Sequence, residues 1–308
     1  MKQRVAIIDL GTNTFHLLIA EGTADAYREL VHQQVAVKLG EGGINHGVIQ
    51  LAAFERGLET MEQFRDLIDE HEVTVVKAIG TSALRNAANG KAFIDAVNAK
   101  TGLRIEIIDG DAEAEYIYSG IEAAGCLSET DSLVMDIGGG SVEFIICNKD
   151  RIRWKQSFEA GAARLMDRFH HRDPIAPESI TALTLYLEDT LVPLFAAAAN
   201  YQIEKLVASS GVFETYAALI ESDEGKSFDL KKTKNYAFDK DELLAVIEKL
   251  ILSTHQERLG NELIIPVRVD MIVTASILTR FVMEKLGVDR VVMTTNSLKE
   301  GVLAEMME

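Results

Sequence analysis

Two short segments of this chain each place an aspartate just before a glycine turn, and together they could bind phosphate and a metal ion. Residues 8–20 read IDLGTNTFHLLIA and residues 135–147 read MDIGGGSVEFIIC, with Asp9 and Asp136 at equivalent positions. A glycine turn after a buried strand exposes backbone N–H groups and lets an oxyanion approach closely. Carboxylates are the hard oxygen ligands that Mg²⁺ prefers. One copy alone would fit a hairpin turn with a capping aspartate, but the repeat favours a phosphate and metal site.

Two further segments offer groups that could contact phosphate. The turn ASSG at residues 208–211 lies between an apolar strand and a helix, so its amides and the hydroxyl of Ser209 or Ser210 could bind an anion. The alternative is an ordinary serine-capped helix start. The segment GTSALRNAANG carries Arg85 in an early helical turn, and arginine offers forked donors that suit phosphate oxygens. The alternative for Arg85 is a surface position.

Acidic residues at the start of another helix could supply a general base. The segment IIDGDAEAEYIYSG places Asp111, Glu113 and Glu115 at a strand–helix junction. One of them could accept a proton from an attacking water, although carboxylates in a first helical turn are also stabilised by the helix dipole. The pair His170–His171 is interpreted as a solvated helix end, because neighbouring helical residues point in different directions.

Strands that alternate with helices predict an α/β fold with a mainly parallel sheet. A hairpin at residues 4–21 opens the chain, and strands and helices continue to a polar break at 125–131. The same plan then restarts with the second aspartate–glycine hairpin. The sequence therefore predicts two domains, residues 1–124 and 125–308, with a C-terminal helix over 297–308 that packs back on the first domain.

The composition limits the partners that this chain could have. Its 308 residues include 31 basic and 48 acidic side chains, a net charge of −17, and so acidic a protein repels nucleic acid and anionic membranes. A small anion can still bind where helix N-termini, a metal ion and a few basic residues surround it. Two cysteines make no disulfide framework. Asp9 interrupts the first apolar run too early for a signal peptide, and no segment approaches the ~18 apolar residues of a membrane helix. These features predict a cytoplasmic protein without nucleic-acid or membrane partners.

The motifs, taken in order, resemble those of the exopolyphosphatase/guanosine pentaphosphate phosphohydrolase family. This family belongs to the sugar kinase–actin–Hsp70 superfamily, so the resemblance implies two ribonuclease-H-like (actin-like ATPase) α/β domains around an interdomain cleft. The resemblance covers nearly the whole chain. The matching segments are DLGTNTFHLLIAE, KLGEGG, GTSALRNAANG, IEIIDGDAEAEYIYSG, VMDIGGGSVEFI, GAARL, ASSG, RVDMIVTASIL and NSLKEGVL.

The resemblance also implies roles for individual residues. Glu113 takes the position of the family's catalytic base, although the family's Glu-Glu pair reads Ala-Glu here, and Arg85 matches the family's arginine. Asp136 and Glu143 match the acidic pair associated with metal and catalytic water, and Asp9 is expected to join them at Mg²⁺. The expected phosphate-binding residues are Gly11, Thr12, Asn13 and Thr14 in the first loop, Gly138, Gly139, Gly140 and Ser141 in the second, and Ser209, Ser210 and Gly211 in the third.

The resulting prediction is a Mg²⁺-dependent, homodimeric phosphoanhydride hydrolase that releases terminal phosphate from polyphosphate or guanosine pentaphosphate. Long family members carry a further helical C-terminal portion, so a chain that ends at Glu308 is expected to act on short polyphosphate. Val212 replaces the usual threonine of the third loop, which removes a hydroxyl from the expected phosphate site. Two alternatives remain open: an ATP-dependent small-molecule kinase of the same superfamily, and a non-catalytic sensor of polyphosphate or an alarmone.

Overall fold

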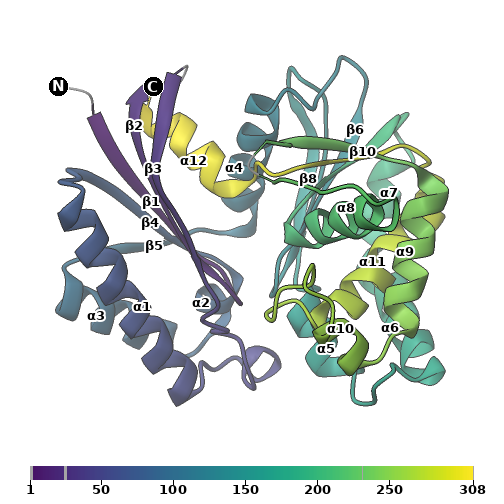
Figure 1. Cartoon of the computed structure of the whole chain (residues 1–308), viewed down its shortest axis with the longest axis horizontal. Coiled ribbons are helices and arrows are strands. Elements are labelled where there is room, and N and C mark those ends of the chain that lie inside the picture. The colour runs from purple at the N-terminus through teal and green to yellow at the C-terminus, as the bar shows by residue number, and fades with distance from the viewer. Residues whose placement is uncertain (1–2, 24–25, 231, 308) are drawn as a thin grey trace. The chain divides into compact units, whose positions relative to one another are not determined.

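The chain folds into two compact units, which Figure 1 shows in colours that run from purple to yellow. Unit 1 comprises Met1–Gly120 and Leu298–Glu308, and unit 2 comprises Ile121–Ser297. The sequence prediction divided the chain after residue 124 and returned a C-terminal helix to the first domain. Glu308, the last residue of that predicted helix, lies outside the described part of the chain. The computed structural model describes residues 3–23, 26–230 and 232–307.

Unit 1 is built on a five-stranded mixed sheet. Its elements are β1 (Gln3–Leu10), β2 (Phe15–Thr23), β3 (Ala26–Val35), a 3₁₀ turn (Ile44–His46), α1 (Leu51–Glu70), β4 (Val75–Gly80), α2 (Ser82–Asn86), α3 (Gly90–Thr101), β5 (Ile105–Ile107), α4 (Gly110–Ala123, of which Gly110–Gly120 fall in this unit) and α12 (Leu298–Met307). The strand order is β3-β2-β1-β4-β5. Helices α1 and α3 cover one face of the sheet, and α12 and α4 lie on the other (Figure 1).

The central strand β1 explains why both faces are covered. Val5, Ala6, Ile7 and Ile8 form a continuous apolar run that is almost wholly buried, as expected of a strand that lies between two layers of helices. Ala6 and Ile8 belong to the core beneath α1 and α3. Because neighbouring strand residues point to opposite faces, Val5 and Ile7 point to the face on which α12 packs.

Unit 2 repeats this plan and adds one strand. Its elements are β6 (Ser132–Ile137), β7 (Val142–Cys147), β8 (Ile152–Phe158), α5 (Ala162–Phe169), α6 (Pro177–Thr190), α7 (Val192–Ala198), β9 (Lys205–Ser209), α8 (Gly211–Asp223), β10 (Asn235–Phe238), α9 (Lys240–Leu252), α10 (His255–Leu259), α11 (Met271–Leu286) and β11 (Val291–Thr294). The strand order is β10-β11-β9-β6-β7-β8. Read from β8, the first five strands follow the order of unit 1, with β10 added at the far edge.

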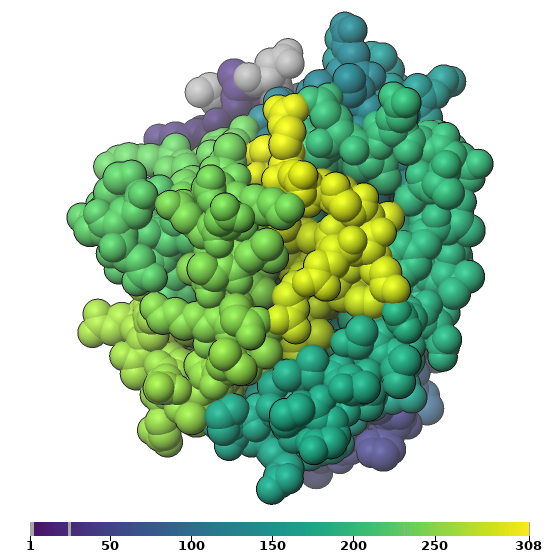
Figure 2. Space-filling view, turned by 90° about the vertical axis from the view of Figure 1, so that its right-hand side faces the viewer, coloured from purple at the N-terminus to yellow at the C-terminus, as the bar shows by residue number. Residues whose placement is uncertain are grey.

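Helix α11 is the most deeply buried of the described helices in unit 2. Eleven of its sixteen residues are buried, and it contacts α5, α6 and α9. Figure 2 shows the late part of the chain, in yellow, flanked on the surface by green segments on one side and teal segments on the other. Helix α11 therefore contacts α5, the helix that follows β8.

The predicted fold class, two ribonuclease-H-like α/β domains, is confirmed, but the prediction of a mainly parallel sheet is wrong. In each unit, the hairpin and its third strand pair antiparallel and the strands β1, β4 and β5 or β6, β9 and β11 pair parallel, while β10 pairs antiparallel with β11 at the far edge of unit 2. The physical reason is connection length, because short turns can join only antiparallel neighbours while parallel strands need a crossover.

Among the described residues, no single helix is long and apolar enough to cross a membrane. Helices α6 and α7, which bend by 57° at the break between them, would meet the length and composition criteria only as a pair.

Candidate active site

The first glycine loop connects β1 to β2 and is held from behind by residues 38–40. The N–H of Gly11 donates to the carbonyl of Thr14 (3.1 Å), which closes the turn. The carbonyl of Thr12 accepts from Gly40 N (3.0 Å), and the carbonyl of Asn13 accepts from Lys38 N (2.7 Å). The segment KLGEGG therefore supports the loop, a role that the sequence did not reveal.

The second glycine loop connects β6 to β7 and has the same turn. Gly138 N donates to Ser141 O (3.0 Å), as Gly11 N does to Thr14 O. Here the start of α5 holds the loop from behind. The carbonyls of Gly138, Gly139 and Gly140 accept from backbone N–H groups of residues 161–164 over 2.9–3.2 Å, and the Arg164 guanidinium adds a second bond to Gly140 O (3.0 Å).

These bonds determine which way the loop amides point. In a trans peptide the N–H points opposite to the carbonyl of the preceding residue. Since the carbonyls of Thr12 and Asn13 face residues 38–40, the N–H groups of Asn13 and Thr14 point to the other side of the loop. By the same geometry the N–H groups of Gly139, Gly140 and Ser141 point away from α5. Both loops thus present a row of N–H donors, which is a concave anion-binding arrangement.

Two of the predicted metal ligands are neighbours in unit 2. Asp136 and Glu143 are directly opposite each other on β6 and β7, and both are buried. Ser157 Oγ donates to Glu143 Oε1 (2.6 Å), and Ser297 Oγ donates to Asp136 Oδ2. These two serines, which sequence analysis did not identify, fix the orientation of the carboxylates.

The donor set fits Mg²⁺. Within the described residues, no three His, Cys, Asp or Glu side chains are arranged to enclose a metal ion. Mg²⁺ does not need such a cage, because it is usually bound by one or two carboxylates together with water and substrate phosphate oxygens. The facing carboxylates of Asp136 and Glu143 meet this requirement within unit 2. In unit 1, Asp9 lies opposite His16, at the positions that Asp136 and Glu143 occupy in the second hairpin.

The structure distinguishes Glu113 from the other acids of its helix. Asp111 and Glu115 are exposed, whereas Glu113 is only 7% exposed. The start of α4 is fixed by Asp109, whose side chain accepts from Ala112 N (2.8 Å) and whose carbonyl accepts from Glu113 N (3.0 Å). The helix thereby turns the Glu113 side chain inward.

Arg85 is not a surface residue, and it contacts Glu113. Its guanidinium Nη1 donates to Glu113 Oε2 (3.0 Å) and to the carbonyl of Ile108 (2.9 Å). This places the predicted base and the predicted arginine of unit 1 together, on α4 and α2. The ion pair fixes the orientation of the carboxylate, as a group that must accept a proton at a defined position requires.

The third loop connects β9 to α8. Ser209 is completely buried, and its hydroxyl donates to the carbonyl of Asn296 (3.1 Å), so its proton is already used. Ser210 occupies the N-cap position but makes no capping bond through its side chain, and its buried Oγ has no hydrogen-bond partner. The simple alternative of a serine-capped helix therefore does not describe this turn. Val212 packs in the hydrophobic core, which gives that position a packing role.

An arginine that sequence analysis quoted only within a motif covers this loop. Arg268 lies so close that a Cβ on Gly211 would be 1.6 Å from its Nη2. Its guanidinium donates to Thr215 Oγ1 (3.1 Å) and to Glu214 Oε2 (3.2 Å). Burial lowers the pKa of Arg268, and the neighbouring Glu214 carboxylate opposes that shift.

Comparison with known proteins identifies the family. The chain matches the Ppx/GppA phosphatase family over residues 18–308. It belongs to this family. A crystal structure of an exopolyphosphatase from Cytophaga hutchinsonii has 41% sequence identity and a TM-score of 0.96, with 99% of this chain and 98% of that chain covered.

Other relatives of this Ppx/GppA protein differ in length. Exopolyphosphatase 2 of Mycobacterium tuberculosis is 29% identical over 314 residues, which cover 97% of each chain. The guanosine-5'-triphosphate,3'-diphosphate pyrophosphatase of Vibrio campbellii is 24% identical over 303 residues, which cover 98% of this chain and 59% of the relative. This chain thus spans about three fifths of the length of that relative. The Aquifex aeolicus PPX-GPPA enzyme has 24% identity and a TM-score of 0.81, a likeness of fold.

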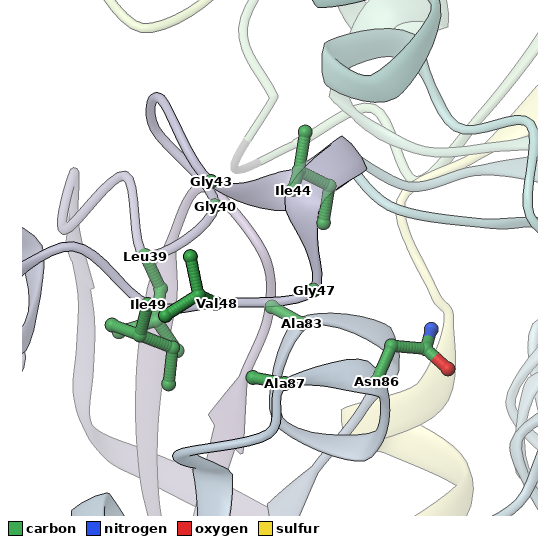
Figure 3. A pocket seen from close by; sticks show the side chains of 10 residues that line it. All are labelled: Leu39, Gly40, Gly43, Ile44, Gly47, Val48, Ile49, Ala83, Asn86 and Ala87. Carbon is green, nitrogen blue, oxygen red and sulfur yellow. The ribbon is translucent and has the colours of Figure 1, made fainter.

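A small pocket of this Ppx/GppA chain lies in unit 1, beside the segment that supports the first glycine loop. It is formed by the backbone of Gly40, Gly43 and Gly47 and by mostly apolar side chains, including Ile44 and Ala83 (Figure 3). It separates the loop that supports Thr12 from helix α2. Without charged groups in its lining, it does not suit a phosphate chain.

Proposed function

We propose that this Ppx/GppA protein is a divalent-metal-dependent hydrolase that removes terminal phosphate from short inorganic polyphosphate or from guanosine pentaphosphate. One observation carries the proposal. Both glycine loops direct their carbonyls toward a supporting segment, so that their N–H groups point to the opposite side. Names of the relatives supply the substrate classes, since they include an exopolyphosphatase and a guanosine pentaphosphate pyrophosphatase.

The residues divide the chemistry among them. The loop amides would bind phosphate oxygens, and Arg85 would stabilise charge on the transferring phosphoryl group. Glu113 would accept the proton of the attacking water. Asp136 and Glu143 of unit 2 would hold Mg²⁺, which when bound neutralises charge on the phosphate oxygens, and Asp9 is the candidate metal ligand of unit 1. Because phosphoryl transfer depends mainly on positioning and electrostatics, so few groups are sufficient.

Phosphate release from tripolyphosphate and from guanosine pentaphosphate, with and without Mg²⁺, tests the proposal. Glu113→Gln should lower kcat about 10²–10⁴-fold, the usual contribution of a general base. Asp111→Asn is the matched control, since this acid lies in the same helical turn but is exposed, and it should retain wild-type kcat. If the wild type and Glu113→Gln release phosphate equally slowly, the catalytic assignment is wrong.

The two alternatives from the sequence give distinct results in the same assay. Thermal stabilisation of the wild type by tripolyphosphate without any phosphate release would indicate a sensor. ATP consumption that depends on a small-molecule acceptor would indicate a kinase.

A further inference from the structure

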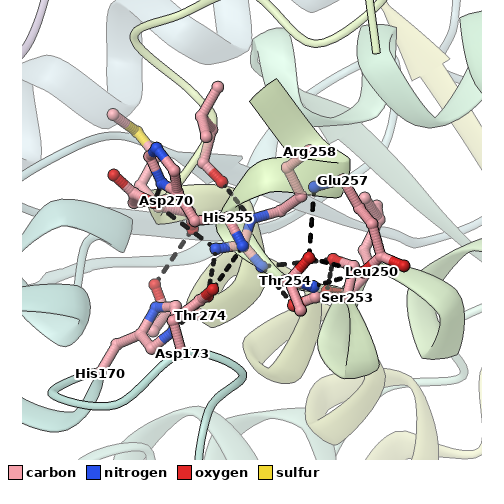
Figure 4. Close-up of polar contacts among 12 residues, drawn as sticks. His170, Asp173, Leu250, Ser253, Thr254, His255, Glu257, Arg258, Asp270 and Thr274 are labelled. Atoms are coloured by element: carbon pink, nitrogen blue, oxygen red, sulfur yellow. Dashed lines mark hydrogen bonds and ion pairs between the residues drawn. The ribbon is translucent and has the colours of Figure 1, made fainter. Parts of the chain in front are cut away.

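The most completely buried charged side chain in the described part of the chain is Arg258, on the short helix α10. Its side chain is 1% exposed, and every guanidinium nitrogen has an acceptor. Nε donates to the carbonyl of Val269 (2.5 Å), Nη1 to the carbonyl of Ser253 (2.5 Å), and Nη2 to Asp173 Oδ1 (2.7 Å). Nη2 also lies 3.5 Å from Asp270 Oδ1. Figure 4 shows the guanidinium at the centre of these contacts.

The Arg258 contacts join three segments that are distant in sequence. Asp173 lies between α5 and α6, Ser253 follows α9, and Val269 and Asp270 precede α11. Asp173 also accepts from the backbone N–H of His255. Burying an ion pair costs several kcal/mol per ion and often adds no net stability over an apolar replacement. Stability alone therefore does not explain Arg258, and its contacts instead fix the backbone of the segment before α11.

The enforced geometry lies next to the third loop. Val269, whose carbonyl Arg258 holds, directly follows Arg268, whose guanidinium covers Gly211 and bonds Glu214 and Thr215. With its carbonyl and the following Asp270 both tied to Arg258, the backbone at Val269 cannot shift without breaking a buried charge-assisted bond. The position from which Arg268 reaches the loop is thereby fixed.

The third loop needs such support because its backbone is strained. Ser210 has φ 115° and ψ 156°, a region that is essentially restricted to glycine and costs about 1–3 kcal/mol. A strained conformation persists only where the surrounding structure enforces it. Arg268, lying over Gly211 and bonded to the first turn of α8, is the side chain in position to do so.

We propose that Arg258 is a positioning residue for the third loop: it holds the Val269–Asp270 backbone so that Arg268 keeps Ser210 and Gly211 in their strained conformation. The conformational part of this proposal stands on the contacts above. Its consequence for substrate binding rests on the proposed function together with the sequence prediction that the third loop binds phosphate.

Three variants test the proposal. Arg258→Met removes the donors and leaves the Asp173 carboxylate, which is 33% exposed, without its guanidinium partner, so it lowers the stability of the unit as well. The double variant Arg258→Met with Asp173→Asn removes that charge as well. Arg258→Lys keeps the positive charge but lacks the forked donors of the guanidinium, and it should partly restore the order of the third loop that Arg258→Met loses. Leu187→Ala in α6 is the control, because it destabilises the unit 2 core at a completely buried residue with no polar part in the Arg258 contacts.

Amide hydrogen exchange at residues 209–213 is the first measurement, and it needs no substrate. Exchange should be about tenfold faster in the double variant than in Leu187→Ala, with Arg258→Lys between the double variant and the wild type. Equal exchange in the double variant and Leu187→Ala would overturn the proposal.

Kinetics with tripolyphosphate are the second measurement. The double variant should raise KM about tenfold with kcat nearly unchanged, the pattern of lost ground-state binding, whereas Leu187→Ala should change neither. If exchange at residues 209–213 responds as expected but the wild type releases no phosphate, the proposed function fails and the positioning role stands. If the wild type is active but KM does not change in the double variant, the third loop is not coupled to substrate through Arg258.

Discussion

Replacing Ser210 by glycine should stabilise unit 2, although it removes a side chain from a partly buried turn. The backbone of Ser210 has φ 115° and ψ 156°, a conformation that glycine adopts without strain but that costs any other residue about 1–3 kcal/mol. Glycine relieves this strain but makes the unfolded chain more flexible, which costs about 0.4–1 kcal/mol. The net expectation is a gain of about 1.3 kcal/mol in the free energy of unfolding. For a unit of this size that raises Tm by about 3–6 °C.

Thermal and urea unfolding of three variants at one protein concentration test this value. Ser210→Ala removes the same unpartnered hydroxyl but keeps the strained backbone, so it separates the effect of the hydroxyl from that of strain. Ser209→Gly is the second control, because it removes the buried hydroxyl that donates to the carbonyl of Asn296 at the end of strand β9. Ser210→Gly should be more stable than Ser210→Ala, and Ser209→Gly less stable than the wild type. If Ser210→Gly is no more stable than Ser210→Ala, the strain argument is wrong.

The same variant tests whether the strain serves substrate binding. A glycine at position 210 lets the third loop leave its native conformation at little cost. KM for tripolyphosphate should therefore rise in Ser210→Gly even as Tm rises, an instance of stability gained at the expense of a preorganised site. An unchanged KM would show that the loop's strain has no part in binding.

Three further predictions concern packing, pH and thiol chemistry. Gly161→Ala should destabilise unit 2 and lower kcat/KM at least tenfold, since a Cβ there would lie 2.5–2.6 Å from backbone atoms of the second loop. The control is Gly225→Ala, where a Cβ meets nothing within 4 Å but the backbone has φ 75°; it should lower Tm through backbone strain and leave kcat/KM unchanged. Kinetics and Tm of both variants test this prediction. Burial and the nearby Arg258 charge lower the pKa of His170, and the carboxylates of Asp173 and Asp270 oppose this shift. As pH falls, the unfolded chain therefore binds a proton at this histidine before the folded chain does, and stability should decline below about pH 6.5. In His170→Asn the urea-unfolding midpoint should depend less on pH over that range, and an unchanged pH dependence would contradict the assignment. Both cysteines are buried and free, and burial raises the pKa of Cys147 to about 12, so native protein should react with a thiol reagent far more slowly than protein in urea; rapid labelling of the native chain would show that unit 2 opens readily.

The two hairpins and their loops could be predicted because the residues that determine each of them are close together in the sequence. An aspartate, a glycine turn and an apolar strand occupy a dozen residues, and the same turn bond forms in both copies, from Gly11 to Thr14 and from Gly138 to Ser141. The choice of Glu113 among three acids came from the resemblance. Its burial depends on how α4 packs, which local sequence does not specify.

The groups that hold the site were not predictable in the same way. Ser297 reaches Asp136 from 161 positions along the chain, and no local pattern marks such a contact. Strand β3 was missed because it is an exposed edge strand without clear alternation. The interpretation of His170–His171 as a solvated helix end is wrong for His170, whose side chain is 4% exposed, since Arg258 and Asp173 enclose it; His171 is exposed as expected.

The two hairpins share a backbone and differ in chemistry, and this difference bears on the proposed division of labour. Both loops turn their N–H groups outward by engaging their carbonyls from behind, but unit 1 does so with an irregular segment and unit 2 with the first turn of α5. A helix start adds its positive dipole end behind the second loop. Opposite the aspartate, unit 1 carries His16 where unit 2 carries Glu143. An imidazole does not replace a carboxylate as a ligand for a hard cation. At these positions unit 2 therefore has a carboxylate pair for Mg²⁺ and unit 1 has a single carboxylate, while unit 1 supplies Glu113 and Arg85. Glu143→Gln should therefore abolish Mg²⁺-dependent activity, whereas His16→Gln should change it little; equal losses in the two variants would mean that the hairpins contribute alike.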